Sequence, residues 1–203
     1  MLNDNKADIA VLVSGGGTNL QALIDAQNNG VIKSGRISLV VSDNPDAYAL
    51  ERAKKAGIKT EIITKKDFGD SFEENIKKYL VENGVDIIVL AGFMTILSEN
   101  FTSEFKNRII NVHPSLIPSF CGKGFYGLRV HKAALEKGVK VTGATVHFVN
   151  EIPDGGEIIM QKAVDVKEGD TPETLQKRVM EEAEWKILPL ACELVCSKIY
   201  NKR

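Results

Sequence analysis

The sequence has no long apolar run, few cysteines and no pair of cysteines at metal-binding spacing. Its three cysteines, Cys121, Cys192 and Cys196, are an odd number without a CxxC motif, which argues against a disulfide framework and against structural zinc. Cys192 and Cys196 stand four residues apart, a spacing typical of small core residues on one face of a C-terminal helix. No apolar run approaches the roughly 20 residues that span a bilayer, and the first residues lack the apolar segment of a signal peptide. We therefore expect a cytoplasmic protein.

The sequence also lacks an excess of positive or of negative charge. Lys and Arg number 26 and Asp and Glu number 27, which gives a formal net charge of −1. No global field would then draw the protein to nucleic acid or to anionic lipid, so we expect neither partner. The 203 residues are enough to bury a proper core, and no linker or repeat divides them. We predict one domain over residues 1–203.

Short apolar runs alternate with longer amphipathic runs over the first two thirds of the chain. The apolar runs predict strands at Ile9–Val13, Ile37–Val41, Thr60–Ile63, Val85–Leu90 and Ile109–His113. Helices are predicted between them, at Thr18–Asn28, at Ala47–Ala56 and from Phe72 to Gly84. Such alternation, with strands that are almost continuously apolar, is typical of a parallel sheet covered on both faces. We predict a doubly wound α/β fold with a mostly parallel sheet.

The last third of the chain has a different pattern. Two β-rich runs, Val139–Val149 and Glu157–Val166, flank the turn sequence Pro153-Asp154-Gly155-Gly156 and predict a hairpin or a mixed extension of the sheet. Thr171, followed by proline, is typical of a helix N-cap, and an apolar face then continues almost to the end. Pro189 is expected to kink or split that helix. The fold should therefore end in a β-extension and a helix.

Asn111 and His113 stand at the end of a predicted strand, just before Pro114. Side chains alternate along a strand, so both should project to the same side. Because the residue before a proline is biased toward extended geometry and proline cannot supply the next ladder N–H, His113 should be the last strand residue. An amide donor and a titratable imidazole would then share one rim. The alternative is that Asn111 satisfies backbone groups in a turn and His113 is a half-buried structural residue.

The run Ser14-Gly15-Gly16-Gly17-Thr18-Asn19 lies between the first predicted strand and the first predicted helix. Glycines let the backbone approach a ligand, and the free N–H groups of a helix N-terminus favour an anion such as phosphate. The run is neither a Walker A loop nor GxGxxG, so neither ATP nor NAD is supported. The alternative is a plain turn with Thr18 as N-cap and Gln21 completing a capping box, which is compatible with an anion site.

Two further features point to the same sheet edge. Ala91–Leu97 is largely apolar and follows the strongest strand, at the edge where ligands bind in open α/β sheets, so it could form a wall for a flat heterocycle. Core packing is the alternative, and for Phe93, Met94 and Leu97 taken singly it is favoured. Asp154 lies in a turn, where Asp is common for local reasons. If that turn reaches His113, its carboxylate would favour the imidazolium form.

Four motifs together resemble the folate-dependent phosphoribosylglycinamide formyltransferase family. They are Ser14–Gln21, Ala91–Met94, Asn111–Pro118, and Gly143–Val149 followed by Asp154-Gly155-Gly156. The motifs stand in the family's order and cover nearly the whole chain. The resemblance implies a Rossmann-like formyltransferase fold, with a nucleotide-binding half at about 1–110 and a catalytic, folate-binding half at about 111–203.

The resemblance also assigns roles to residues. It implies a catalytic set, which is Asn111, His113 and Asp154. It implies a binding set for the ribonucleotide, with Glu184 at the ribose, which is Gly15, Gly16, Gly17, Thr18, Asn19 and Glu184. It implies a folate-binding set, which is Met94, Thr95, Ile96, Leu97 and Asn111.

The implied reaction transfers the formyl group of 10-formyltetrahydrofolate to the amine of glycinamide ribonucleotide, in purine biosynthesis. Attack by the amine gives a tetrahedral intermediate, whose oxygen the Asn111 amide and a protonated His113 could stabilise. Asp154 would support the charged His113 and help to move the amine proton. Folate is the cosubstrate, no metal is needed, the partners are small molecules, and the enzyme would be a monomer or a homodimer.

Three positions depart from the family pattern. The connection from Pro118 to Leu128 is a few residues longer than usual, Gly69-Asp70-Ser71 lacks a basic residue expected near the folate tail, and Glu184 is followed by Trp185 where the family has histidine.

Two other functions remain open. A formyltetrahydrofolate hydrolase uses the same Asn, His and Asp set, but it carries a regulatory domain before the first strand, which begins near Ile9 here. It also has no need of a loop for a phosphorylated acceptor. The second alternative is a non-catalytic nucleotide-binding module in which the three polar residues are structural.

Overall fold

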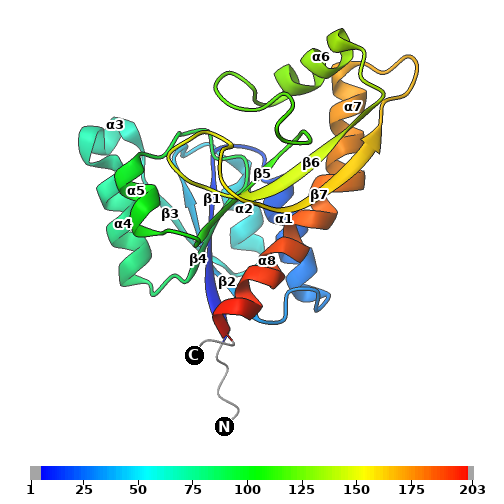
Figure 1. Ribbon diagram of the computed structural model, residues 1–203. Helices are drawn as coiled ribbons and strands as arrows, with labels where there is room; N and C mark the ends of the chain where they lie inside the picture. Colours follow the sequence, from blue (N-terminus) through cyan, green and yellow to red (C-terminus); the bar gives the residue numbers. More distant parts are fainter. Residues whose placement is uncertain (1–5, 201–203) are drawn as a thin grey trace.

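The computed structural model describes residues 6–200, and its centre is a seven-stranded sheet (Figure 1). The strands are β1 Ala7–Val13, β2 Gly35–Ser42, β3 Lys59–Ile62, β4 Ile87–Leu90, β5 Ile109–His113, β6 Val141–Phe148 and β7 Ile158–Asp165. Their order is β3-β2-β1-β4-β5-β6-β7. The first five pair in parallel, whereas β6 is antiparallel to both β5 and β7. The predicted α/β fold and its β-extension are confirmed.

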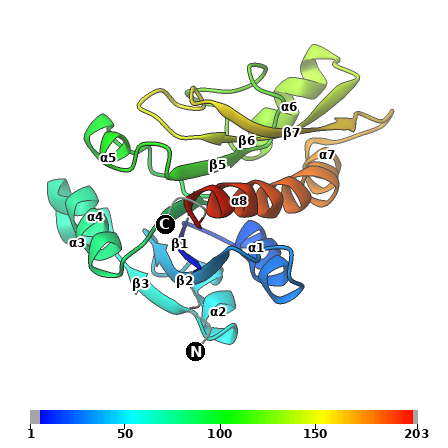
Figure 2. The ribbon, with the colours of Figure 1, turned by 60° about the horizontal axis from the view of Figure 1, so that its bottom comes forward.

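Helices cover both faces of the sheet. They are α1 Thr18–Asn28, α2 Tyr48–Lys55, α3 Lys65–Phe68, α4 Phe72–Glu82, α5 Glu99–Glu104, α6 Leu128–Lys137, α7 Pro172–Val179 and α8 Trp185–Tyr200. A short 3-10 helix at Gly69–Ser71 precedes α4, and a π-helical segment at Met180–Glu184 joins α7 to α8. Figure 2 shows α4 and α5 on one side of the sheet and α1 and α8 on the other. Within residues 6–200, no helix combines the length and apolar character needed to cross a membrane.

The two faces have separate cores because side chains alternate along each strand. In β1, Ile9, Val11 and Val13 pack with α1, α2 and α8, whereas Ala10 and Leu12 pack with α4 and α5. All five side chains are fully buried, which accounts for the continuous apolar run. A sheet buried on both sides leaves the carboxyl edge of its parallel strands as the place for a site.

The C-terminal helix differs from the prediction. Pro189 lies inside α8 and the helix continues through it, so of the two predicted outcomes, a kink or a split, the split is wrong. A proline removes the hydrogen bond to the carbonyl four residues earlier, here that of Trp185. Trp185 is the first residue of α8 and follows the π segment directly, so the missing bond falls where the helix already changes its hydrogen-bond pattern. Cys192 and Cys196 are fully buried in α8, as predicted.

Candidate active site

Asn111 and His113 lie on β5, the strand at which the sheet changes from parallel to antiparallel pairing. β5 ends at His113, directly before Pro114, as the sequence predicts. Across the antiparallel pair with β6, Asn111 is aligned with His147 and His113 with Thr145. Residues two apart on one strand share a face, and so do residues paired directly across two strands. Asn111, His113 and His147 therefore all belong to the same face of the two strands.

Asp154 is brought to this face by the turn that follows β6. Its backbone φ is 57°, in the left-handed region that a short polar residue such as Asp tolerates. Its Oδ2 atom lies 3.5 Å from Nδ1 of His113, and its Oδ1 atom lies 3.5 Å from Nε2 of His147. The backbone N–H of Gly122 donates a hydrogen bond to Oδ2 at 2.8 Å. One carboxylate therefore joins two histidines and the Cys121–Tyr126 loop.

These contacts favour an ionised Asp154. Burial alone would raise the pKa of its carboxyl. The hydrogen bond that His147 donates when its ring is protonated, the charge of a protonated His113 and the N–H of Gly122 together outweigh burial and lower that pKa.

His113 is 4% exposed, and its Nε2–H donates to the carbonyl oxygen of Phe120 at 2.9 Å. Burial lowers the pKa of His113, and the attraction of Asp154 and the Phe120 carbonyl only partly offset that effect. The expected attraction is therefore present, but it does not make the imidazolium the favoured form.

Behind this site, the ring nitrogens of His131 on α6 are buried and have no partner among residues 6–200, and burial lowers the pKa of His131 to about 4.

His147 orients the amide of Asn111. The Nδ1–H of His147 donates to the carbonyl oxygen of Phe148 at 2.7 Å, so in the neutral ring Nε2 is an acceptor. The Nδ2 atom of Asn111 lies 3.2 Å from that acceptor. One amide hydrogen of Asn111 is thus bound, and the second is available to a substrate oxygen.

The glycine loop has a different helix start from the one expected. Gly17, with φ 71°, occupies the N-cap position of α1, and no side chain caps the helix. Thr18 is the first helical residue, and the side chain of Gln21 binds Asp25 and Arg52, so the capping-box interpretation is wrong. Glycine suits this N-cap position because its φ is left-handed and because a Cβ atom there would lie 2.6 Å from Cβ of Ala49.

Asn19 and Glu184, 165 residues apart in the sequence, meet beside this loop. The Nδ2–H of Asn19 donates to Oε2 of Glu184 at 2.8 Å. Glu184 is 6% exposed, and burial raises the pKa of its carboxyl, an effect that the bond from Asn19 partly opposes. The Oδ1 atom of Asn19 is buried without a partner among the described residues. The pair therefore offers a ligand two kinds of acceptor, the amide oxygen of Asn19 and the carboxylate of Glu184.

The segment after β4 divides between core and surface. Met94 and Ile96 are 57% and 66% exposed, whereas Leu97 is 5% exposed and belongs to the core beside α4 and α5. The core-packing alternative therefore holds for Leu97 and not for Met94. The N–H of Met94 donates to Oγ of Ser14 at 2.9 Å, and Oγ1 of Thr95 donates to Asp43 at 2.9 Å. This apolar surface is thereby tied to the glycine loop.

The sequence is similar to that of known proteins over most of its length. A model of the formyl transferase family matches residues 7–192. The chain belongs to this family. It is 44% identical to the phosphoribosylglycinamide formyltransferase of Haemophilus influenzae, over 90% of this chain and 84% of that protein. It superposes on glycinamide ribonucleotide transformylase 1 of Symbiobacterium toebii with a TM-score of 0.89 and 43% identity, covering 96% of this chain and 89% of that one.

The chain also resembles part of a larger protein. It is 46% identical to the trifunctional purine biosynthetic protein adenosine-3 of Gallus gallus, over 97% of this chain and 19% of that protein. The chain therefore spans about a fifth of the length of those trifunctional relatives.

Within this fold, the predicted residues form two groups. Asn111, His113 and Asp154 lie in one cluster, and Asn19 and Glu184 form a second pair beside the glycine loop. Sequence reasoning did not assign a role to His147, because a histidine in a long β-rich run has the pattern of a core residue. No group of three or more His, Cys, Asp and Glu side chains within the described part of the chain is arranged to hold a metal ion.

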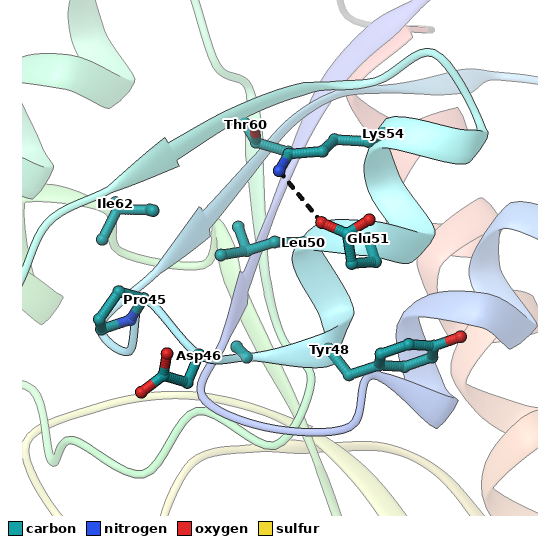
Figure 3. Close-up of a pocket in the computed structure, with 9 residues that line it drawn as sticks. Pro45, Asp46, Tyr48, Leu50, Glu51, Lys54, Thr60 and Ile62 are labelled. Carbon is teal, nitrogen blue, oxygen red and sulfur yellow. Dashed lines mark hydrogen bonds and ion pairs between the residues drawn. The ribbon is translucent and has the colours of Figure 1, made fainter.

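A separate hollow of about 280 Å³ lies over α2 and β3 (Figure 3). It is lined by residues such as Pro45, Leu50 and Ile62, and by the ion pair between Lys54 and Glu51. It contains none of the predicted site residues. A second hollow, of about 300 Å³, borders the glycine loop and is lined by Thr18, Gln21, Ala22, Asp25, Arg52 and Trp185.

Proposed function

We propose that this protein transfers the formyl group of 10-formyltetrahydrofolate to the amine of glycinamide ribonucleotide, a step of purine biosynthesis. The observation that carries the proposal is the cluster of Asn111, His113 and Asp154 at the end of β5. The names of the relatives from Haemophilus influenzae and Symbiobacterium toebii support the same activity.

The two substrates would enter from opposite sides of this cluster. The amides of Gly15, Gly16 and Gly17 with Thr18 and Asn19 would bind the phosphate, because free N–H groups at a helix start favour an anion. Glu184 beside Asn19 would accept from ribose hydroxyls. The exposed Met94 and Ile96, with Thr95 and Asn111, would hold the flat folate ring, and the buried Leu97 would anchor this segment to the core. Residues 1–110 would thus supply most of the nucleotide site, and residues 111–203 the catalytic groups and Glu184.

The chemistry follows from the groups in the cluster. The amine attacks the formyl carbon, the carbonyl π bond breaks, and negative charge develops on the former carbonyl oxygen. The free amide hydrogen of Asn111 donates to that oxygen. His113 supplies a second donor when its Nε2–H exchanges the Phe120 carbonyl for the substrate oxygen.

Asp154 completes the reaction. As an ionised carboxylate it accepts the proton released by the attacking amine, directly or through one water, and returns it to the departing folate nitrogen as the intermediate collapses. It also holds the two histidines in place, because one carboxylate contacts both.

An absorbance assay of formyl transfer tests the proposal. The purified protein is mixed with 10-formyltetrahydrofolate with and without glycinamide ribonucleotide. We expect folate turnover that requires the ribonucleotide. Equal turnover without it would identify a hydrolase, and no turnover in either mixture would identify a binding module or a different acceptor.

A further inference from the structure

Three consecutive carbonyl groups of the glycine loop are bound by one other segment of the chain. The carbonyl oxygen of Ser14 accepts from Nδ2 of Asn44 at 3.0 Å. That of Gly15 accepts from the backbone N–H of Ala49 at 3.0 Å. That of Gly16 accepts from Nε of Arg52 at 2.8 Å. The Asn44–Arg52 segment, which links β2 to the middle of α2, therefore fixes all three carbonyls from one side.

The direction of the carbonyls sets the direction of the loop amides. In a planar trans peptide unit, the C=O of one residue and the N–H of the next point in opposite directions. The N–H groups of Gly15, Gly16 and Gly17 therefore point away from the Asn44–Arg52 segment. None of them donates to an acceptor within residues 6–200. Successive free amides that converge in this way form a concave site for an anion.

The two side chains of this segment are themselves held in orientation. Oδ1 of Asn44 accepts from the N–H of Asp46 at 3.0 Å, which leaves Nδ2 as the atom that faces Ser14. Asn44 is further bound through its backbone to the buried hydroxyl of Ser42. The orientation of this amide is therefore fixed by the β2–α2 connection and not by a ligand.

Arg52 is fixed at three points. Besides Nε on Gly16, its Nη1 atom donates to Oε1 of Gln21 at 3.1 Å, and its guanidinium lies 5.1 Å from the ring centre of Tyr48. Tyr48 projects from the first turn of α2, beside the loop that leads into α1 (Figure 3). A planar guanidinium with donors in two directions can bridge the loop and α1, which an ammonium cannot do with the same geometry.

We propose that Asn44 and Arg52 are positioning residues for a phosphomonoester, and that they act by holding the loop carbonyls away from it. This inference rests on the proposed function, because it assigns the loop to the phosphate of the acceptor. Arg52 also places a positive charge behind the loop, on the side of the loop carbonyls. Loss of either side chain lets a loop carbonyl turn, and a carbonyl oxygen that faces the phosphate repels it.

The test measures phosphate recognition apart from turnover. Binding of ribose 5-phosphate is followed by calorimetry for wild type, Asn44→Ala, Arg52→Gln, Arg52→Lys and the control Lys54→Gln. Lys54 is a basic residue on the same helix whose ion pair with Glu51 lies on the surface. Kinetics are then compared for glycinamide ribonucleotide and for the glycinamide riboside that lacks the phosphate. Thermal melting checks that each variant folds.

We expect Asn44→Ala and Arg52→Gln to bind ribose 5-phosphate about 10- to 100-fold more weakly than Lys54→Gln. The kcat/KM for the ribonucleotide should fall by a similar factor, while kcat/KM for the riboside and the KM for folate stay within about twofold of wild type. Arg52→Lys should recover only a small part of the loss, because its ammonium cannot reproduce the bridge to Gly16 and Gln21.

Three results would overturn the inference. These are unchanged ribose 5-phosphate affinity in folded Asn44→Ala and Arg52→Gln, equal losses for ribonucleotide and riboside, or full recovery by Arg52→Lys, which would leave only a charge effect. Failure of the proposed function is visible separately. If wild type binds ribose 5-phosphate through this loop but transfers no formyl group, the reaction is wrong and the phosphate site stands.

Discussion

Asn111 and His147 are direct partners across β5 and β6, and Nδ2 of the amide lies 3.2 Å from Nε2 of the imidazole. While the ring of His147 is neutral, this bond holds the amide of Asn111 with its second N–H directed away from His147, as the proposed reaction requires. It depends on strand register, since a shift of one residue would turn His147 to the other face of the sheet. The register of the sheet thus fixes the amide that the proposed reaction uses as an oxyanion donor.

Replacement of Asp154 by Asn should separate catalysis from binding. The carboxylate that raises the pKa of His113 is lost, so the pKa of His113 should fall further below its usual value. We expect kcat to drop by about 100- to 1,000-fold, with ribose 5-phosphate affinity unchanged. Steady-state kinetics and NMR titration of the histidine rings measure both effects. His113→Ala should lose turnover similarly, and wild-type-like turnover in either variant would contradict the assigned roles.

His131 should make the fold sensitive to acid. Its pKa is about 4 in the folded protein and 6.5 in the unfolded chain, so the unfolded chain binds more protons between these values. Stability is therefore full above pH 6.5 and falls as the pH decreases toward 4, by about 3 kcal/mol. Because Leu cannot be protonated, His131→Leu should remove most of this dependence. Urea unfolding at several pH values measures it, and an unchanged pH dependence would show that His131 is not the cause.

Glu184 should have the opposite dependence on pH. Burial raises the pKa of its carboxyl, so stability is full below the ordinary carboxyl pKa and is lost as the pH rises through the raised value. Glu184→Gln keeps the shape without the charge. It should be more stable than wild type at neutral pH and should bind ribose 5-phosphate more weakly. The prediction would fail if the difference in stability between Glu184→Gln and wild type were the same at pH 5 as at pH 8.

Gly17 and Gly15 offer a matched pair of substitutions. At Gly17 an alanine would take a left-handed φ of 71° and place its Cβ atom 2.6 Å from Cβ of Ala49, so Gly17→Ala should lose about 2 to 4 kcal/mol of stability. At Gly15 a Cβ atom meets nothing within 4 Å, and Gly15→Ala should stay within about 0.5 kcal/mol of wild type. Chemical denaturation compares the two, and equal stabilities would contradict the close packing of the loop on α2.

The elements that local patterns describe were predictable from sequence. Alternation placed Asn111 and His113 on one face, and Pro114 marked the end of β5. The apolar runs identified the parallel strands, because a sheet buried on both sides leaves a continuous signal. Helix α6 was not predicted, although Gly127 before it and Gly138 after it frame its apolar residues. The start of the C-terminal helix was predicted less well, since proline propensity does not report a preceding π segment.

Features that depend on distant pairing were not predictable in this way. His147 joins the site through antiparallel register with Asn111, and no local pattern reports register across 36 residues. Arg52 contacts Gly16 because α2 packs against the loop, whereas its sequence surroundings are those of any helix surface. The balance at His113 is also a result of the fold, because burial and the charge of Asp154 act on it in opposite directions.

The π segment at Met180–Glu184 has a consequence for how this chain can change in evolution. A π turn holds one residue more than an α turn, so deletion of a single residue there would restore regular α-helical bonding. The flanking turns would keep their phase, because the wide turn is what accommodates the extra residue, but the side chains of the segment itself would be displaced. Glu184 would then leave Asn19. Relatives that keep the contact between Asn19 and Glu184 are therefore expected to keep the residue count of this segment.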